Sequence, residues 1–191
     1  ELPGCDGSAE AFTAALASAG VAKLATPRRR LLVEHTIRVG DEQAWIEARP
    51  PQRNGLSIDY CLDYGEGPIG RQKCHCRLND YEFPHELAPA RTFLLQEEAV
   101  EIANRGLGKR VTSRDLLIFG ELGPIDNRLR FDNECARHKV LDMVGDLTLA
   151  GCDIVGHIVG HRTGHLENAM LVTELLRTHA IDINPSLRAV A

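Results

Sequence analysis

Apolar and polar residues alternate through the first part of the chain with a period of two. Four such runs follow one another, at residues 31–39, 43–49, 56–64 and 71–78. This period is typical of strands with one buried and one exposed face. Glycine, proline and aspartate separate the runs, as they do at tight turns. The pattern therefore predicts four strands joined as an antiparallel meander.

Helical spacing dominates the rest of the chain. Residues 86–104 are mostly helical in pattern, and residues 116–119 form a short apolar strand before a Gly-Pro turn. In the last third of the chain, the pattern predicts a helix that is capped by Asp132 or Asn133 and ends near Gly151. A strand at about 153–161 and a helix at roughly 166–178 are predicted to follow it. The sequence thus predicts an α+β fold in which an antiparallel sheet packs against helices.

Residues 1 to about 25 have the pattern of a turn followed by a short helix. Ser8 is placed to cap this helix and Gly20 to end it. The predicted inward face carries Phe12, Ala15 and Leu16. A proline and three arginines at 27–30 are typical of a linker, so this segment is expected to stand apart from the sheet.

Composition limits the classes of function. The 191 residues carry a formal net charge of -5, which gives no basic footprint for nucleic acid. No apolar stretch reaches the length of about 18 residues that a membrane-spanning helix needs. The six cysteines are irregularly spaced, which does not suggest a disulfide framework and favours reduced thiols in the cytoplasm.

The predicted helix at 138–147 carries the most informative chemistry. Because an α-helix has about 3.6 residues per turn, His138, Asp142 and Asp146 stack along one face. His138 and Asp142 could bind the same Zn²⁺, with Asp146 one turn further on to orient a partner. The same residues could equally form an ordinary charged face, in which His138 only pairs with Asp142.

A second segment, at residues 160–168, favours the chemical interpretation. Two glycines bracket a sharp turn, and His165 lies where the last helix would begin. A histidine at that point can face a cleft and transfer a proton near neutral pH.

Several motifs occur in a fixed order along the chain. They are Leu-Pro-Gly-Cys-Asp-Gly-Ser-Ala at 2–9, Ala-Arg-Thr-Phe at 90–93, Arg-Phe-Asp-Asn-Glu at 130–134, His-Lys-x-Leu-Asp-x-x-Gly-Asp-Leu at 138–147 and Gly-His at 164–165. In this order they resemble the UDP-3-O-acyl-N-acetylglucosamine deacetylase family, the zinc enzymes of the committed step of lipid A synthesis. The resemblance extends from Glu1 to about Arg177.

The family pattern includes a Glu-His pair ahead of the Asp-Gly-Ser-Ala turn, which supplies the general base and the first zinc ligand. The resemblance therefore implies that residues 1–26 end a first domain and residues 27–191 form the second domain of a two-domain enzyme, with a small βαβ-like insert at about 94–123. We expect this chain to lack that pair and the N-terminal domain, and to be inactive by itself. Glu34 and His35 are no substitute, because neighbours in a strand face opposite sides.

The resemblance also implies the reaction, which is hydrolysis of the acetamide of UDP-3-O-acyl-N-acetylglucosamine with release of acetate. His138 and Asp142 would be two of the three protein ligands of Zn²⁺. His165, held by Asp146, would either stabilise the oxyanion or protonate the departing amine. The sequence leaves both roles open.

Substrate contacts are implied in the same way. Thr92 would hydrogen-bond the acetamide oxygen, Phe93 would line the site, and Lys139 would reach a sugar or phosphate oxygen. Arg162 is a weaker candidate for the diphosphate, and an ordinary surface arginine fits it better. Candidates for a passage for the acyl chain, with core packing as their rival, are Leu107, Leu116, Ile118 and Phe119.

Two other clusters have simpler explanations than a metal site. Cys74 and Cys76 would face one side of a strand and His75 the other, so buried thiols are expected there. His157 and His161 recur four residues apart but lie in a strand-like run, which does not favour a second metal contact.

Two other functions remain compatible with the sequence. One is a non-catalytic remnant that binds a UDP-sugar or an acyl chain. The other is a different metal-dependent amidohydrolase built on the same scaffold.

Overall fold

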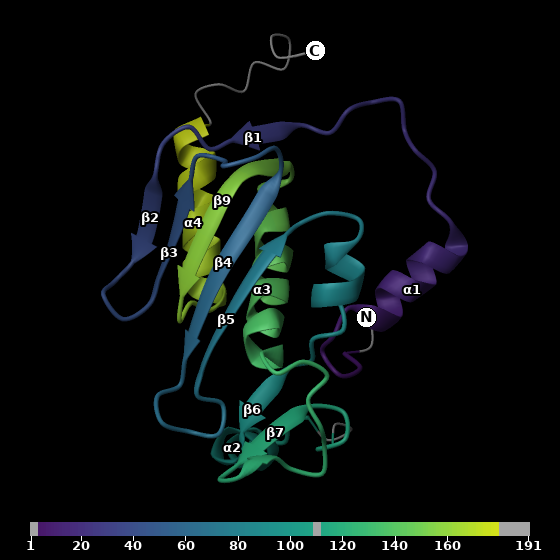
Figure 1. Cartoon of the computed structure of the whole chain (residues 1–191), viewed down its shortest axis with the longest axis vertical. Coiled ribbons are helices and arrows are strands. Elements are labelled where there is room, and N and C mark those ends of the chain that lie inside the picture. The colour runs from purple at the N-terminus through teal and green to yellow at the C-terminus, as the bar shows by residue number, and fades with distance from the viewer. Residues whose placement is uncertain (1–3, 109–111, 180–191) are drawn as a thin grey trace.

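A six-stranded sheet lies at the centre of the computed structural model, which describes residues 4–108 and 112–179 (Figure 1). The strands are β1 (Arg30–Leu32), β2 (Ile37–Gly40), β3 (Trp45–Arg49), β4 (Leu56–Asp63), β5 (Arg71–Arg77) and β9 (Asp153–His161). Their order is β2-β3-β9-β4-β5, and β1 pairs with the beginning of β9. Because β9 is antiparallel to β3 but parallel to β1 and β4, the sheet is mixed.

The position of β9 shows that the predicted meander was wrong in one respect. β3 and β4 follow one another in sequence but are not neighbours, because β9 lies between them. β9 is nine residues long, and most of its inward positions are buried. A long buried strand is stabilised best where both of its edges are paired. Alternation with a period of two identifies strands but does not give their order.

The first predicted strand is also divided. Residues 31–39 form β1 and β2, and Glu34 and His35 lie in the exposed connection between them. The chain must leave the sheet there because β1 pairs with β9 whereas β2 pairs with β3. The prediction that these two side chains face opposite sides of one strand was therefore wrong.

Two helices cover one face of the sheet, α3 (Glu134–Leu147) and α4 (His165–His179), and both lie behind it in Figure 1. Alternate side chains of β4 point toward them and are buried in the hydrophobic core, namely Ile58, Tyr60 and Leu62. The helices contribute Met143 and Leu171 to the same core. This arrangement confirms the predicted α+β fold.

The elements predicted around the candidate chemistry have nearly the expected bounds. The strand predicted at about 153–161 is β9, and the two predicted helices are α3 and α4. α3 begins after Asn133, whose side chain makes no capping hydrogen bond. The 3₁₀ turn η2 (Thr148–Ala150) extends its end, and Gly151 then adopts the left-handed conformation that favours glycine, with φ 67°.

A smaller sheet lies at one end of the molecule, at the bottom of Figure 1. β6 (Phe93–Leu95) runs parallel to β7 (Leu117–Gly120), with α2 (Gln96–Asn104) between them in sequence. β8 (Gly123–Pro124) adds a short antiparallel edge. This β6-α2-β7 unit confirms the predicted βαβ-like insert. A single π-helical turn, η1 (Phe83–Leu87), connects β5 with this region.

The N-terminal helix α1 (Glu10–Ala19) contributes little to the core. It contains no buried residue, and Leu16 is 68% exposed. Ala15 is exposed as well, so the helix buries neither residue against the described part of the chain. In Figure 1 the helix lies to one side of the sheet, joined to β1 by a long connection.

The turn before α1 and the first residue of the helix, Glu10, hold this segment to the rest of the fold. The backbone N–H of Ala9 donates to the carbonyl oxygen of Ala88 at 2.8 Å. Ser8 is buried, and its backbone N–H donates to Asp6 Oδ1 at 3.0 Å. This docking places the N-cap one residue later, at Ala9, so the predicted Ser8 cap was wrong.

No helix in the described part of the chain is long and apolar enough to cross a membrane.

Gly160 sets the distance between β9 and α3, and its replacement gives a first prediction. A Cβ at this position would lie 2.6 Å from Met143 Cε and 2.8 Å from a ring carbon of Tyr60. We expect Gly160→Ala to lower the free energy of unfolding by about 1–3 kcal/mol, because overpacking displaces core side chains. Urea denaturation measures the change.

Gly145→Ala is the matched control on α3. Nothing lies within 4 Å of a Cβ added at Gly145, and the residue is exposed. The control should stabilise the helix by up to about 1 kcal/mol. Equal destabilisation by both changes would contradict the packing argument.

Candidate active site

One face of α3 carries His138, Asp142 and Asp146, as the helical spacing predicts. His138 is 6% exposed, and its Nε2 lies 3.4 Å from Asp142 Oδ1. Asp146 follows one turn later, and its side chain is 19% exposed. The structure therefore places an imidazole and two carboxylates in a row, at the edge between core and solvent.

The partners of His138 determine which ring nitrogen carries the proton. Nδ1 lies 3.1 Å from the carbonyl oxygen of Ala90, which can only accept, so Nδ1 is protonated. In the neutral ring Nε2 then carries the lone pair and can accept a hydrogen bond from the Thr92 hydroxyl at 3.1 Å. Histidines that bind metals commonly donate their other N–H to a backbone carbonyl in this way.

The separation of the two donor atoms fits a zinc ion. With bonds of about 2.0–2.2 Å and tetrahedral angles, two ligand atoms of zinc lie roughly 3.3–3.5 Å apart. His138 Nε2 and Asp142 Oδ1 already have this separation, at 3.4 Å. Across residues 4–108 and 112–179, no three His, Cys, Asp or Glu side chains are grouped so that they could hold a metal. His138 and Asp142 thus offer a pair of possible metal ligands.

A buried ion pair fixes the segment that carries Thr92. Arg91 and Glu134 are 5% and 0% exposed. The guanidinium of Arg91 donates from Nε to Oε1 at 2.8 Å and from Nη2 to Oε2 at 3.1 Å, and this two-point geometry specifies orientation. In the sequence, Glu134 was identified only as part of the motif at 130–134, with no role of its own. The pairing was missed because its partners lie 43 residues apart.

The N-terminal turn closes the other side of Thr92. A Cβ at Gly7 would lie 1.8 Å from Thr92 Oγ1, and its φ of 75° also favours glycine. Asp6 holds this turn through Arg130, whose Nη2 donates to Asp6 Oδ2 at 3.0 Å. Burial acts to raise the pKa of Asp6, but hydrogen bonds from Ser8 and Arg130 outweigh it and keep the pKa below its usual value.

His165 and Asp146 form a second pair beside the first. His165 opens α4, and its Nδ1 lies 2.8 Å from Asp146 Oδ2. The His165 side chain is 71% exposed, so its Nε2 is free to meet a substrate. Asn168 Nδ2 donates to the same carboxylate oxygen at 2.9 Å. Sequence reasoning missed Asn168, although its position three residues after His165 places both on one side of a helix.

Comparison with known proteins gives this arrangement a context. A sequence model of the family described as LpxC, UDP-3-O-acyl N-acetylglycosamine deacetylase, matches residues 1–177. This chain belongs to that family.

Curated relatives named UDP-3-O-acyl-N-acetylglucosamine deacetylase are about one third identical to it over the matched residues. Identities are 33% over 179 residues for Blochmanniella pennsylvanica, 34% over 177 for Anaeromyxobacter dehalogenans and 36% over 180 for Geobacter sp. strain M21. These matches cover 92–93% of this chain and 57–60% of the relatives. The chain thus spans about three fifths of the length of these deacetylases.

Two residues that the deacetylase resemblance assigned to the substrate lie next to His138 and Asp142. Lys139 Nζ is 3.3 Å from Asp142 Oδ2, and the Lys139 side chain is 18% exposed. The ring of Phe93 meets that of His138 edge-on, with centroids 6.2 Å apart. Their contact with substrate stays a prediction. Arg162 is exposed, in the turn between β9 and α4.

The acyl-chain candidates of the insert differ in their surroundings. Phe119 is 2% exposed and belongs to the hydrophobic core, which favours the packing explanation for that residue. Leu107 is 56% exposed, and Leu116 and Ile118 are half-buried.

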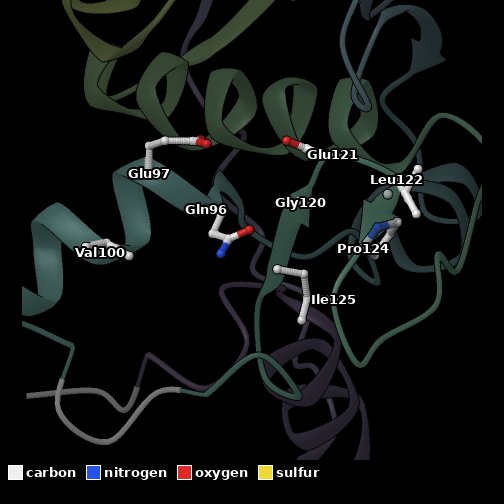
Figure 2. Close-up of a pocket in the computed structure, with 9 residues that line it drawn as sticks. Gln96, Glu97, Val100, Gly120, Glu121, Leu122, Pro124 and Ile125 are labelled. Atoms are coloured by element: carbon white, nitrogen blue, oxygen red, sulfur yellow. The ribbon is translucent and has the colours of Figure 1, made fainter.

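A hollow of about 830 Å³ does lie on the insert, and none of the four acyl-chain candidates lines it. Figure 2 shows Gln96 of α2 and Ile125 on its two sides, with Gly120 between them. The rest of its wall comes from α2, from the turn between β7 and β8, and from β8 itself. A lining role for the predicted residues stays a prediction.

Two other groups of cysteine and histidine side chains, on β5 and on β9, have the geometry predicted for them. Cys74 and Cys76 are buried whereas His75 is exposed on the other face of β5. Burial raises the pKa of the Cys74 thiol to about 11 and that of Cys76 to about 12, so both stay protonated at neutral pH. His157 and His161 lie on β9, a strand as expected.

The buried ion pair gives a second prediction. Glu134→Ala should lower the free energy of unfolding by about 3–5 kcal/mol, because the Arg91 guanidinium would remain buried without a counter-charge. Glu86→Ala is the control, since Glu86 pairs with Arg137 but its side chain is 43% exposed. The control should cost at most about 1 kcal/mol. Equal losses in thermal or urea unfolding would show that burial of the pair is unimportant.

Proposed function

We propose that this chain forms part of a zinc-dependent deacetylase that hydrolyses the acetamide of UDP-3-O-acyl-N-acetylglucosamine, in the cytoplasm, at the committed step of lipid A synthesis. The observation that carries the proposal is the 3.4 Å pair of His138 Nε2 and Asp142 Oδ1, with the proton of His138 held on Nδ1. The names of the relatives support the substrate.

His138 and Asp142 would hold Zn²⁺ through Nε2 and Oδ1. When bound there, zinc supplies Lewis-acid polarisation of the amide carbonyl and a more acidic water. The third protein ligand and the general base are predicted to be the histidine and glutamate of the family's Glu-His pair. Glu34 and His35 lie in the exposed connection between β1 and β2.

Thr92 is suited to bind the developing oxyanion. Its hydroxyl lies 3.1 Å from His138 Nε2, at the edge of the ligand pair. A hydroxyl fixed there can donate to the acetamide oxygen as negative charge develops, with little reorganisation. The Arg91–Glu134 pair and the Gly7 turn provide that rigidity.

His165 is suited to move a proton. Asp146 holds Nδ1, which leaves Nε2 to face the substrate. As water adds to the amide carbon and the C–N bond breaks, the amine must gain a proton, and a protonated Nε2 can deliver it. The same imidazolium could instead stabilise the oxyanion. Lys139 and Phe93 would contact the sugar and its phosphate, and the insert would contact the acyl chain.

The metal assignment gives a third prediction, for the full-length protein. His138→Ala and Asp142→Ala should each lose zinc and acetate release together, because each removes a ligand atom. Metal content by mass spectrometry of the purified variants checks it. His157→Ala is the control, since His157 is a similarly buried histidine on β9. Stoichiometric zinc in both ligand variants would overturn the assignment.

The proton-transfer assignment gives a fourth prediction. His165→Ala should retain zinc but slow acetate release by about 10²- to 10⁴-fold, the usual scale for one acid–base group. Asp146→Asn should do less damage, because it acts through His165. Rates at saturating substrate, measured beside zinc content, test both. Loss of zinc from His165→Ala would mean that a ligand had been mistaken for an acid.

A further inference from the structure

The carboxylate of Asp146 has two donors on one oxygen. Oδ2 lies 2.8 Å from His165 Nδ1 and 2.9 Å from Asn168 Nδ2. The two donors lie in opposite environments, since the His165 side chain is 71% exposed and Asn168 is 1% exposed. One end of this three-residue chain is therefore in solvent, and the other is anchored in the core.

The orientation of the Asn168 amide follows from chemistry. An ionised carboxylate oxygen can only accept, so the NH₂ group must face Asp146. The carbonyl oxygen then points away, and Asn168 Oδ1 is buried without a hydrogen-bond partner in the described structure.

An unpartnered buried acceptor destabilises a folded protein. A leucine is similar in size and would avoid this penalty. Packing alone therefore does not explain an amide at position 168, whereas its bond to Asp146 does.

We propose that Asn168 is a positioning residue for the predicted proton-transfer pair, an inference that rests on the proposed function. It holds the Asp146 carboxylate in the orientation that accepts the Nδ1 proton of His165. A neutral histidine carries its proton on either nitrogen, and the bond made by one nitrogen fixes the state of the other. With Nδ1 occupied, Nε2 becomes the reacting atom.

The neighbouring backbone is fixed independently of Asn168's side chain. The Tyr60 hydroxyl donates to the carbonyl oxygen of Thr163 at 2.9 Å. The backbone N–H of Gly164 donates to Glu167 Oε2 at 2.8 Å. Because these bonds hold the turn before His165, loss of the Asn168 amide should release the carboxylate and leave the start of α4 in place.

The test uses the full-length, zinc-loaded protein with Asn168→Leu and Asn168→Asp. Leucine removes the donor and the unpartnered carbonyl together. Aspartate is the matched control, because an acid buried beside the Asp146 carboxylate stays protonated and can donate its hydroxyl in place of the amide. The main measurement is the tautomer of His165 in ¹⁵N-histidine-labelled protein, at a pH where the ring is neutral. Long-range ¹H–¹⁵N correlations report the tautomer, with His165→Ala for assignment.

We expect the wild-type protein and Asn168→Asp to carry the proton mainly on Nδ1, and Asn168→Leu to shift toward Nε2–H. The kcat for acetate release by Asn168→Leu should fall about tenfold with little change in KM, the scale known for partners that orient a functional side chain. Asn168→Leu should melt at the same temperature as the wild type or above it. Leu171→Ala is the control, because Leu171 is fully buried one turn later in α4. It should lower the melting temperature and leave the tautomer unchanged.

The outcomes separate this inference from the proposed function. Absence of acetate release from the wild type, with the tautomer shift present, would overturn the function and support the positioning role. An Nδ1–H tautomer retained in Asn168→Leu would overturn the positioning role, whatever the activity. A wild-type protein without a preference for Nδ1–H would also overturn the positioning role.

Discussion

The ion pair between Arg91 and Glu134 is the interaction on which the rest of the site depends. Both side chains are almost fully withdrawn from water, and such charges are tolerated only when their polar atoms are satisfied. Glu134 accepts from the backbone and the guanidinium of Arg91 and from the backbone of Arg130. This geometry allows one placement of residues 90–93 against α3, and so keeps Thr92 beside His138.

The sequence predicted the elements of the fold better than their arrangement. Local periodicity determines whether a segment is a strand or a helix, so β9, α3 and α4 were predicted close to their observed bounds. The order of strands depends on which partner best buries each edge, which is not a local property. That is why β9 was not expected between β3 and β4, and why the division of residues 31–39 was missed.

The site shows the same division between local and distant information. His138, Asp142 and Asp146 share a helix face because of spacing alone, and His165 was predicted from its place at a helix start. Glu134 and Asn168 act across 43 and 22 residues of sequence, through bonds that only the folded chain reveals. The predicted inactivity of this chain by itself, and the roles of the site residues, stay predictions.

The central place of β9 has a consequence for how the chain reaches its fold. β2 and β3 form one half of the sheet and β4 and β5 the other, and in the described sheet β9 joins them. In sequence, β9 follows both halves and is separated from them by the insert and α3. Contacts between such distant segments form slowly, because a long loop must close first. Until then β3 and β4 present unpaired edges, which are templates for pairing with other chains. On a ribosome, β9 is the last strand of the described sheet to emerge, so the edges of β3 and β4 stay open to other chains until it arrives.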